Sequence, residues 1–453
     1  MTTLIASENS LPRGLGAEEA FILHCLRVGL CAAADDRSSA ARRPAVDWDK
    51  AYEKAVRLGV APLLYGIMKD RPPLSVEGHI PERFVRGIRM EYVKTWAMNI
   101  RDRTGLAEIL KQFNAVGIKI ILLKGIHLAL FVYQDIGFRS MTDVDILISK
   151  EDLFKAEELL FGAGYECPEL SRAVYDFFDV DSGARERDIL RERYKIDHHH
   201  LHPFSSRRGV KNLDIHWTLT TPSLPASIDM EGIWTRAEHR EMDGTDVLML
   251  CPEDIILHLA LHASFSGKFT IYGLRSLCDI AAITRYSRGG IDWDELRLRA
   301  QRWKVDKLVY LALRLSTHLL GVDMPDATLR SMEPERFNEG IAVEAARRLF
   351  YAGGRQEKIY RPEMFAREIP LQKKVAFIFR RIFPSPQELA EMYSLPVSST
   401  RAYLYYPLRL GSLLYRYSFL YAKFFLYLWT HRRADPFGYD LETYLSTKAI
   451  GKR

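Results

Sequence analysis

Residues 118–149 read IKIILLKGIHLALFVYQDIGFRSMTDVDILIS, and this stretch decides the fold because it alternates strand and helix patterns. Apolar runs at 118–123 and 144–148 have the length of buried strands. Asp143 and Asp145 lie two residues apart at the second run. Side chains with that spacing on a strand point to the same face, so both carboxylates are directed at one point. Mg²⁺ takes oxygen ligands and is usually held by one or two carboxylates together with substrate phosphates. The pair therefore predicts a metal site that handles phosphate.

The length and composition describe a globular chain of more than one domain. The chain has 453 residues, and a prior of about 150 residues per domain gives two or three units. Hydrophobic residues make up 47% and charged residues 27%, which excludes a disordered or fibrous chain. The net charge of +6 is modest for this length, whereas a nucleic-acid-binding protein more often has a concentrated basic face. We therefore expect no nucleic-acid partner.

The cysteines and the first residues favour a cytoplasmic location. The five cysteines are scattered, with no Cys-x-x-Cys spacing: Cys25, Cys31, Cys167, Cys251 and Cys278. This distribution argues against a disulfide framework or a zinc ribbon. The sequence MTTLIASENSLPRGLG has acidic and polar residues where a secretory peptide needs a basic start and an apolar run. A reducing cytoplasm is the expectation.

Helical periodicity lies on both sides of the central stretch. Helices are expected at 17–34, 47–70, 83–116, 252–265, 274–286 and 293–320. Two further strand-like runs, 197–204 and 210–219, flank a Ser-Ser-Arg-Arg-Gly segment and predict a hairpin. Four regions follow: an N-terminal helical region at 1–95, an α/β core at 96–222, a helical domain at 223–400, and a basic, aromatic C-terminal helix and tail at 401–453.

The segment 401–433 combines basic and aromatic residues. Arg409, Arg416 and Lys423 recur every seven residues among Tyr, Phe, Leu and Trp. Charges inside the apolar run argue against a membrane-spanning helix. Two expectations stay open: peripheral contact with the inner face of a membrane, or packing against the helical domain or a second subunit.

A third acidic residue follows the Asp-x-Asp pair along the chain. Asp214 lies in the strand-like sequence LDIHW. A two-metal phosphoryl-transfer site holds its ions about 3.5–4 Å apart, so that they clamp the attacking and leaving oxygens. It needs a carboxylate from a second strand, and we expect an antiparallel neighbour to bring Asp214 beside Asp143. Asp214 is then also the candidate general base.

The order of these motifs resembles a known family. LLKG, then R-x-x-x-D-x-D followed by apolar residues, then h-D-h-H-W (h for apolar) is similar to the uncharacterised nucleotidyltransferases of the DNA polymerase β superfamily. The similarity extends over roughly 48–320. The resemblance implies an α+β fold, a small mixed sheet with flanking helices, joined here to N-terminal and C-terminal helical regions. It also implies nucleotidyl transfer from ATP or another nucleoside triphosphate with Mg²⁺ (or Mn²⁺), and Asp143, Asp145 and Asp214 as catalytic metal ligands.

The first motif departs from this superfamily. Lys124 and Gly125 stand where Gly-Ser or Gly-Gly is usual. Lys124 is a candidate point-charge contact to phosphate, and Gly125 allows close approach of the backbone to it. Arg139, four residues before Asp143, is a candidate fork for two phosphate oxygens. The alternative is that Lys124 and Arg139 neutralise the acidic cluster and serve the structure.

Histidines offer a different metal hypothesis. The alternating residues His198, His200 and His202 are followed by His216 in the LDIHW run, and imidazole suits Zn, Ni or Cu. A solvated strand face is the commoner outcome for such a pattern. His258 and His262 are one helical turn apart with Asp254 one turn earlier, but HLALH lacks the glutamate of a zinc-protease motif. Packing is the expectation for that pair.

The sequence contains no motif that identifies the acceptor of the nucleoside monophosphate. We expect transfer of a nucleoside monophosphate to a hydroxyl or phosphate of a small molecule, sugar or protein, and a protein or RNA acceptor would make the chain an adenylylating regulator or toxin. The alternative from another class is a nucleotide-binding or scaffold protein that keeps the fold without turnover. The departure at Lys124 motivates that alternative.

Overall fold

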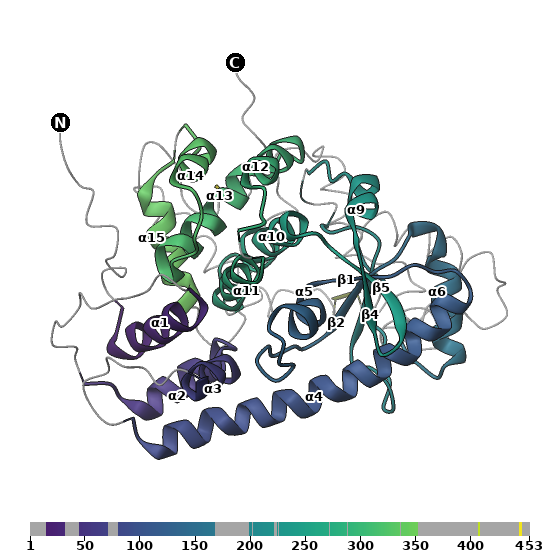
Figure 1. Cartoon of the computed structure of the whole chain (residues 1–453), viewed down its shortest axis with the longest axis horizontal. Coiled ribbons are helices and arrows are strands. Elements are labelled where there is room, and N and C mark those ends of the chain that lie inside the picture. Colours follow the sequence, from purple (N-terminus) through teal and green to yellow (C-terminus); the bar gives the residue numbers. More distant parts are fainter. Residues whose placement is uncertain are drawn as a thin grey trace. The chain divides into compact units, whose positions relative to one another are not determined.

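The computed structural model describes most of the chain up to residue 351. The described residues are 15–31, 45–70, 80–167 and 199–351 except 202, 222, 223, 225, 271, 288 and 336, together with 406–407 and 444–445. The chain divides into two compact units, the first Met1–Pro168, Leu190–Gly354 and Asp440–Arg453, the second Glu169–Ile189 and Arg355–Tyr439. Every element described below belongs to the first unit (Figure 1).

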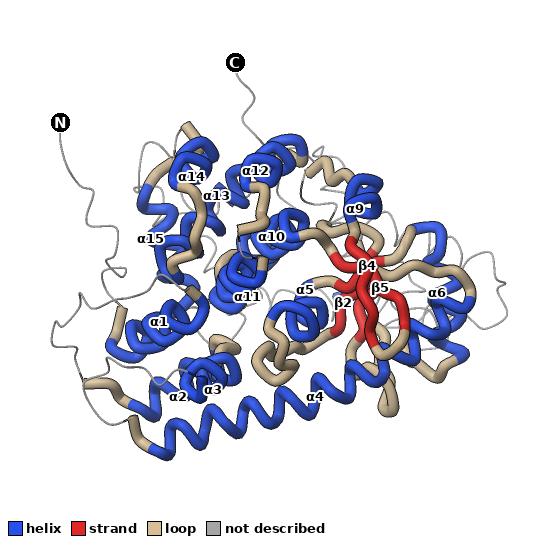
Figure 2. The backbone as a smooth tube through the Cα atoms, viewed as in Figure 1, coloured by secondary structure: helices blue, strands red, loops and turns tan. Residues whose placement is uncertain are grey.

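A five-stranded mixed sheet lies at the centre of the core, in the order β3-β2-β1-β5-β4. The strands are β1 (Ile121–Leu122), β2 (Val144–Leu147), β3 (Leu213–His216), β4 (Glu238–Met242) and β5 (Thr245–Met249). β1 pairs antiparallel with β2 and parallel with β5. Helices lie on both sides of the sheet, among them α5 (Lys124–His127) and α6 (Leu153–Gly162) (Figure 2). The α+β fold with a small mixed sheet and flanking helices is therefore confirmed.

Burial of both sheet faces explains the nearly continuous apolar sequence of the central strands. All residues of β1 and β2 are buried, as expected for strands covered by helices on both faces. Asp145 is the acidic exception within β2, with 4% of its surface exposed. A carboxylate in such a position requires ionic or hydrogen-bonding partners.

The direction of β3 corrects the expected antiparallel pairing. β2 and β3 run parallel, with Asp145 opposite Asp214. The chain leaves β2 through a 3-10 turn (Lys150–Asp152) and α6 before it returns. A crossover of this kind is how parallel neighbours are joined. The predicted hairpin is present on the other side of β3, as antiparallel bridges from His200 to His216 and from Phe204 to Leu213.

A hairpin that the sequence analysis did not predict completes the sheet. β4 and β5 are joined by Asp243 and Gly244, whose φ angles are 51° and 74°. Positive φ at both central residues defines the tight turn that Asp-Gly favours. This hairpin falls within 223–400, which was expected to be helical, and its second strand pairs with β1.

A single long helix joins the N-terminal helices to the sheet. α4 (Glu82–Ala115) has 34 residues, so the expected boundary between 95 and 96 lies inside it. Gly117, with φ of 82°, ends this helix as predicted. Three shorter helices precede it, α1 (Ala17–Leu30), α2 (Trp48–Arg57) and α3 (Ala61–Asp70). Asp47 caps α2 by accepting from the backbone of Lys50, also as predicted.

A helical region follows the sheet. Its elements are α9 (Met230–Arg236), α10 (Pro252–Leu261), a π-helical turn (His262–Ser266), α11 (Gly273–Tyr286), α12 (Trp293–Arg302), α13 (Asp306–Leu315), a second π-helical turn (Ser316–Leu320), α14 (Asp326–Met332) and α15 (Glu339–Tyr351). α9 lies between β3 and β4 in the chain. Every residue of α10 after Pro252 is buried. A helix that is buried all round is central to its region, and α10 packs against α11, α12 and α13.

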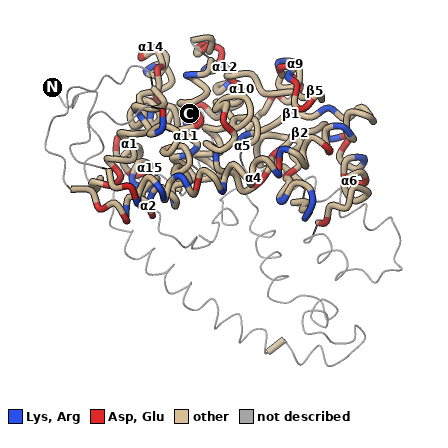
Figure 3. Tube along the Cα trace, turned by 60° about the horizontal axis from the view of Figure 1, so that its bottom comes forward, with Lys and Arg blue, Asp and Glu red and all other residues tan. Residues whose placement is uncertain are grey.

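Basic and acidic residues are interspersed along the described elements (Figure 3). Among the described helices, none has both the length and the apolar content needed to cross a membrane. The segment 401–433 lies outside the described residues except for 406–407. Its predicted contact with a membrane or a subunit stays a prediction.

Candidate active site

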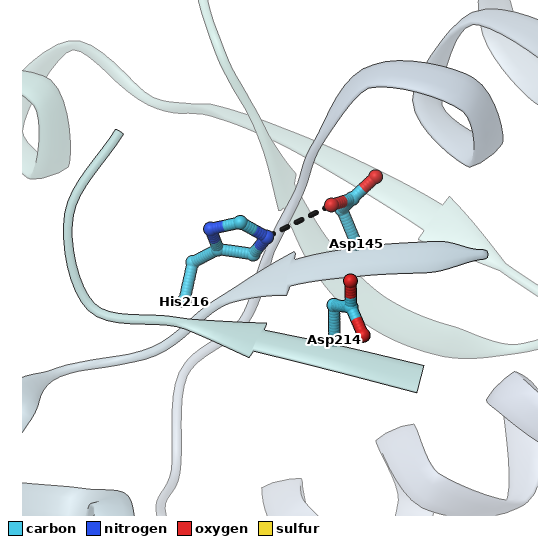
Figure 4. A group of neighbouring side chains, drawn as sticks. All are labelled: Asp145, Asp214 and His216. Atoms are coloured by element: carbon cyan, nitrogen blue, oxygen red, sulfur yellow. Dashed lines mark hydrogen bonds and ion pairs between the residues drawn. The ribbon is translucent and has the colours of Figure 1, made fainter. Parts of the chain in front are cut away.

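The parallel pairing of β2 and β3 places three side chains on one face of the sheet. Asp145 lies opposite Asp214, and Leu147 lies opposite His216. His216 is two residues beyond Asp214 on the same strand, so their side chains share a face. The ligand atoms of Asp145, Asp214 and His216 all lie within 4.8 Å of one another, and Figure 4 shows the three side chains together. Two carboxylates and an imidazole in this arrangement can hold a divalent metal ion.

Asp143 stands at the entrance to β2 beside this group. Its side chain is half-buried, and the hydroxyl of Thr142 donates to its Oδ1 at 3.0 Å. Two of the three predicted carboxylates, Asp145 and Asp214, thus lie together with His216, and Asp143 is close enough for its charge to raise the pKa of Asp214. The assignment of Asp143 as a metal ligand stays a prediction.

Asp145 is the most strongly engaged carboxylate of the site. Its Oδ1 accepts from Nζ of Lys124 at 2.9 Å and from Nε2 of His216 at 2.8 Å. Burial by itself raises the pKa of Asp145, but Lys124 and His216 together hold that pKa well below its usual range. Asp145 is therefore ionised at any physiological pH.

Asp214 has the opposite electrostatic character. Burial and the negative charges of Asp145 and Asp143 raise its pKa to about 7. The pKa of Asp143 is also raised, by burial and then by the charge of Asp145. Neighbouring carboxylates that resist simultaneous ionisation form a site that a cation stabilises.

Lys124 occupies a backbone conformation that favours glycine. Its φ is 38° at the first residue of α5, which follows β1 after Leu123. A side chain in this left-handed region costs about 1 kcal/mol or more. The conformation directs Nζ to Asp145. Lys124 thus neutralises the acidic cluster, as the structural alternative expected, and its contact with phosphate stays a prediction.

Gly125 allows the backbone next to Lys124 to pack closely against Met141. A Cβ at this position would lie 2.8 Å from both Cγ and Sδ of Met141. The close approach that glycine permits is therefore to the Met141 side chain on the segment leading into β2. Whether a phosphate also approaches the Gly125 backbone stays a prediction.

Arg139 is engaged by a carboxylate of the helical region. Its Nε and Nη2 donate to Asp279 of α11 at 2.8–3.0 Å, and the pair is buried. Tyr133 donates to the same carboxylate at 3.0 Å, and Asn99 donates to the Arg139 carbonyl at 2.8 Å. This geometry favours a structural role over the predicted phosphate fork. The charge of Asp143 also raises the pKa of Arg139, opposing burial, so the alternative that Arg139 neutralises the acidic cluster stays a prediction, although its ion-pair partner is Asp279.

The cation that the sequence analysis missed is Arg275. It lies on α11, and its Nη1 donates to the carbonyl of Ser140 at 3.0 Å. Its positive charge lowers the pKa of Asp143, opposing burial and Asp145. Arg275 occurs in the helical sequence LRSLCDIAAI, where an arginine also suits a solvated face. The position of Arg275 near Asp143 depends on tertiary packing, which brings α11 against the segment before β2.

A small pocket adjoins Lys124 on the side of the helical region. Its polar lining comprises Lys124, His199, Thr220, His258, His262 and Ser266, and its apolar lining comprises Leu219, Leu224, Leu261 and Phe265. His258 is 2% exposed, and neither of its ring nitrogens has a hydrogen-bond partner among the described residues. Burial, followed by the charge of Lys124, holds the pKa of His258 well below its usual range. His258 is therefore a neutral donor and acceptor in the wall of this pocket.

The predicted histidine metal site falls partly outside the described residues. His198 and His202 lie outside the described residues. The rings of His199, His200 and His216 pack together, with centroids 4.5–5.3 Å apart. Among the described residues, three metal-ligand atoms converge only in the group of Asp145, Asp214 and His216. Asp254, which precedes His258 by one turn, pairs instead with Arg236 and Arg299.

Comparison with known proteins agrees with the three ordered motifs. The family described as uncharacterised nucleotidyltransferase matches residues 44–321, which is more than half of the chain. The chain belongs to this nucleotidyltransferase family. No curated protein matches it. Among solved structures, it is similar to an antigenic nucleotidyltransferase-like protein from Paracoccidioides brasiliensis, with 15% identity, a TM-score of 0.29, and coverage of 51% of this chain and 97% of that one.

Family membership extends over all the elements that form the site. The matched residues include the sheet, α10 and α11. The predicted resemblance is therefore confirmed at the level of the nucleotidyltransferase family and fold.

Proposed function

We propose that this protein is a metal-dependent nucleotidyltransferase that moves a nucleoside monophosphate from a nucleoside triphosphate to a hydroxyl or phosphate acceptor. One observation carries the proposal: Asp145 and Asp214 lie opposite each other on adjacent parallel strands, and the ammonium group of Lys124 forms an ion pair with Asp145. Family membership supports the reaction class. The acceptor is a small molecule, a sugar or a protein, and the reaction takes place in the cytoplasm.

The donor set fits a divalent metal ion. Asp145 and Asp214 would hold it, with Asp143 at the edge of the site, because their oxygens are the ligands that hard cations prefer. The raised pKa values of Asp143 and Asp214 reflect burial and mutual repulsion that a cation would relieve. When bound, the ion supplies Lewis acidity to phosphoryl and hydroxyl oxygens.

The side chains of the site have separate proposed roles. Asp214 is the candidate general base that would take the proton of an acceptor hydroxyl. Lys124 supplies the positive charge that a phosphate needs beside Asp145. The adjoining pocket, with neutral His258 in its wall, offers hydrogen bonds to an uncharged part of the nucleotide or acceptor. Such positioning and electrostatic contributions dominate phosphoryl transfer.

Pyrophosphate release tests the proposal. Purified protein is incubated with each nucleoside triphosphate, Mg²⁺ or Mn²⁺, and a mixture of candidate acceptors. We expect release that falls at least about 100-fold in Asp145→Asn, since that substitution removes a charged group of the reacting site. Asp246→Asn is the matched control, because Asp246 is an exposed carboxylate on β5 paired with His239. Release that Asp145→Asn leaves unchanged would overturn the proposal.

A catalytically inactive nucleotide-binding or scaffold protein is the second candidate. It is favoured by one observation, the Lys124 ammonium that already pairs with Asp145. This candidate predicts metal-dependent thermal stabilisation by a nucleoside triphosphate without release of pyrophosphate or labelling of any acceptor. Detection of a labelled product would exclude it.

A further inference from the structure

His216 is placed to take part in metal binding as well as to orient Asp145. It is the last residue of β3 and shares a face with Asp214. Its Nε2 lies 2.8 Å from Oδ1 of Asp145, and its ligand atom belongs to the group that converges within 4.8 Å. The functional edge of the ring thus faces the two carboxylates (Figure 4).

We propose that His216 is a direct nitrogen ligand of the metal ion, and that the site therefore selects a first-row transition metal of the Mn²⁺ class over Mg²⁺. The inference rests on the proposed function, because it concerns the ion of the same site. It extends that proposal by naming the ligand and the class of cation.

The separation of the two donor atoms suits coordination. Metal–ligand bonds of about 2.1 Å place two neighbouring ligands at right angles about 3 Å apart. The Nε2 to Oδ1 distance of 2.8 Å is within a few tenths of that value. A cation held between these atoms would require the neutral tautomer of His216 in which Nδ1 carries the proton and the Nε2 lone pair is free.

The contacts of the His216 ring hold its Nε2 edge toward Asp145. His216 is 2% exposed, and its Nδ1 has no hydrogen-bond partner among the described residues. The rings of His199 and His200 pack on it with centroids 5.3 Å away. The only polar contact given for the imidazole is thus to Asp145, at the edge where the carboxylates converge.

The chemistry of the nitrogen and oxygen ligands explains the proposed preference for Mn²⁺ over Mg²⁺. Carboxylate and water ligands suit Mg²⁺, whereas imidazole suits transition metals, and affinity rises from Mn²⁺ along the first row. A site with Asp145, Asp214 and His216 offers both oxygen and nitrogen. Replacing a nitrogen ligand is expected to weaken the binding of Mn²⁺ far more than that of Mg²⁺.

Pulsed electron paramagnetic resonance of bound Mn²⁺ tests the inference without any enzymatic readout. A directly bound imidazole couples its ¹⁴N nucleus to the electron spin. The full-length wild type is loaded with one equivalent of Mn²⁺, and Mn²⁺ and Mg²⁺ affinities are measured in parallel by competition titration. We compare His216→Gln, whose side-chain amide can still donate to Asp145.

We expect ¹⁴N coupling in the wild type and its loss in His216→Gln. The Mn²⁺ affinity of this variant should fall about 10–100-fold, with Mg²⁺ affinity changed by less than about threefold. His200→Gln is the matched control, because its ring packs on His216 but its Nδ1 contacts the carbonyl of Leu201. It should keep both the coupling and the affinities.

Other outcomes overturn the inference in distinguishable ways. Mn²⁺ binding that Asp145→Asn abolishes, but that shows no ¹⁴N coupling in the wild type, would leave the proposed function standing and remove His216 as a ligand. Coupling that disappears in His200→Gln would assign the nitrogen elsewhere. Absence of both Mn²⁺ and Mg²⁺ binding, with and without a nucleoside triphosphate, would reject both proposals. The wild-type spectrum shows whether any nitrogen ligand is present even if His216→Gln does not fold, and His216→Asn is then the second variant that assigns the nitrogen.

Discussion

At the level of single residues, Asp214 is the candidate general base, and its environment lowers the stability of the fold. Its pKa is raised from 3.8 in the unfolded chain to about 7 in the fold, by burial and then by Asp145 and Asp143. An acid with a raised pKa binds its proton more tightly when folded. Stability contributed by the group therefore falls as pH rises from about 4 to about 7, and the full penalty applies above 7. This is the pattern of a functional carboxylate held in an unfavourable environment.

Asp214→Asn should accordingly stabilise the metal-free protein at high pH. We expect a gain of about 1–3 kcal/mol at pH 8, after allowance for solvent screening, and a smaller gain at pH 5. Urea denaturation of both proteins in the presence of a chelator measures the difference. Asp246→Asn, on the exposed side of β5, should change little. An equal gain at both pH values would contradict the assigned pKa.

The backbone at Lys124 gives a second prediction. Its φ of 38° favours glycine, so Lys124→Gly should be more stable than Lys124→Ala by about 1 kcal/mol. Both variants lose the ion pair with Asp145 and should be less stable than the wild type. Comparison of their urea midpoints isolates the backbone term. An alanine variant as stable as the glycine variant would show that the left-handed conformation is not present.

The acidic residues of the site are predictable from sequence because strand periodicity fixes which carboxylates share a face. The role of Lys124 as the partner of Asp145 could be anticipated as an alternative. His216 could not be assigned, since its position beside Asp145 depends on the parallel register of β2 and β3. Arg275 was missed for a related reason, because 135 residues separate it from its contact at Ser140.

At the scale of elements, the buried pair of Arg139 and Asp279 connects the segment before β2 to α11. Removing one member of such a pair leaves an uncompensated buried charge. Arg139→Gln and Asp279→Asn should each lose about 3–5 kcal/mol of stability. The double substitution should lose less than the sum, which a double-mutant cycle in urea measures.

Nucleotide affinity separates this structural role from the predicted phosphate fork. If Arg139 acts through Asp279, the two single variants should weaken nucleoside triphosphate binding to the same degree. A loss confined to Arg139→Gln, with Asp279→Asn unaffected, would restore the phosphate role. Isothermal titration calorimetry at a temperature where both variants are folded gives the comparison.

Most helices could be predicted from the periodicity of apolar residues, whereas two features of the sheet could not. The antiparallel expectation for β3 was wrong because the helix α6 intervenes between β2 and the following hairpin, and helical crossovers join parallel strands. The β4–β5 hairpin carries a signal in Asp243-Gly244 that the sequence analysis passed over. Pairing of β5 with β1 joins segments more than 120 residues apart, which local patterns do not encode.

At the scale of the whole molecule, the site is built jointly by the sheet and the helical region after it. Lys124 follows a strand of the sheet, whereas His258 and His262 of the same pocket come from α10 and the turn after it. The expected division at 222/223 therefore separates residues that line one pocket, and it also separates β3 from β4 and β5. The helical region thus contributes side chains to the wall of this pocket.

The segment 401–433 gives a prediction for the full chain. We expect its basic and aromatic residues to pack on protein, so that co-sedimentation with anionic vesicles is the same for the wild type and for a variant with Arg409, Arg416 and Lys423 replaced by Gln. The two proteins should then differ in thermal stability or oligomeric state. Pelleting of the wild type that the variant loses would establish a peripheral lipid contact instead.

The fate of the α-phosphate distinguishes nucleotidyl transfer from other phosphoryl-transfer reactions. The full-length protein is incubated with nucleoside triphosphate labelled at either the α- or the γ-phosphate, divalent metal, and a cell extract as the source of acceptor. We predict that α-label enters a product as pyrophosphate is released, and that both signals disappear in Asp145→Asn and persist in Asp246→Asn. Transfer of γ-label, or a product that forms equally in Asp145→Asn, would contradict the account.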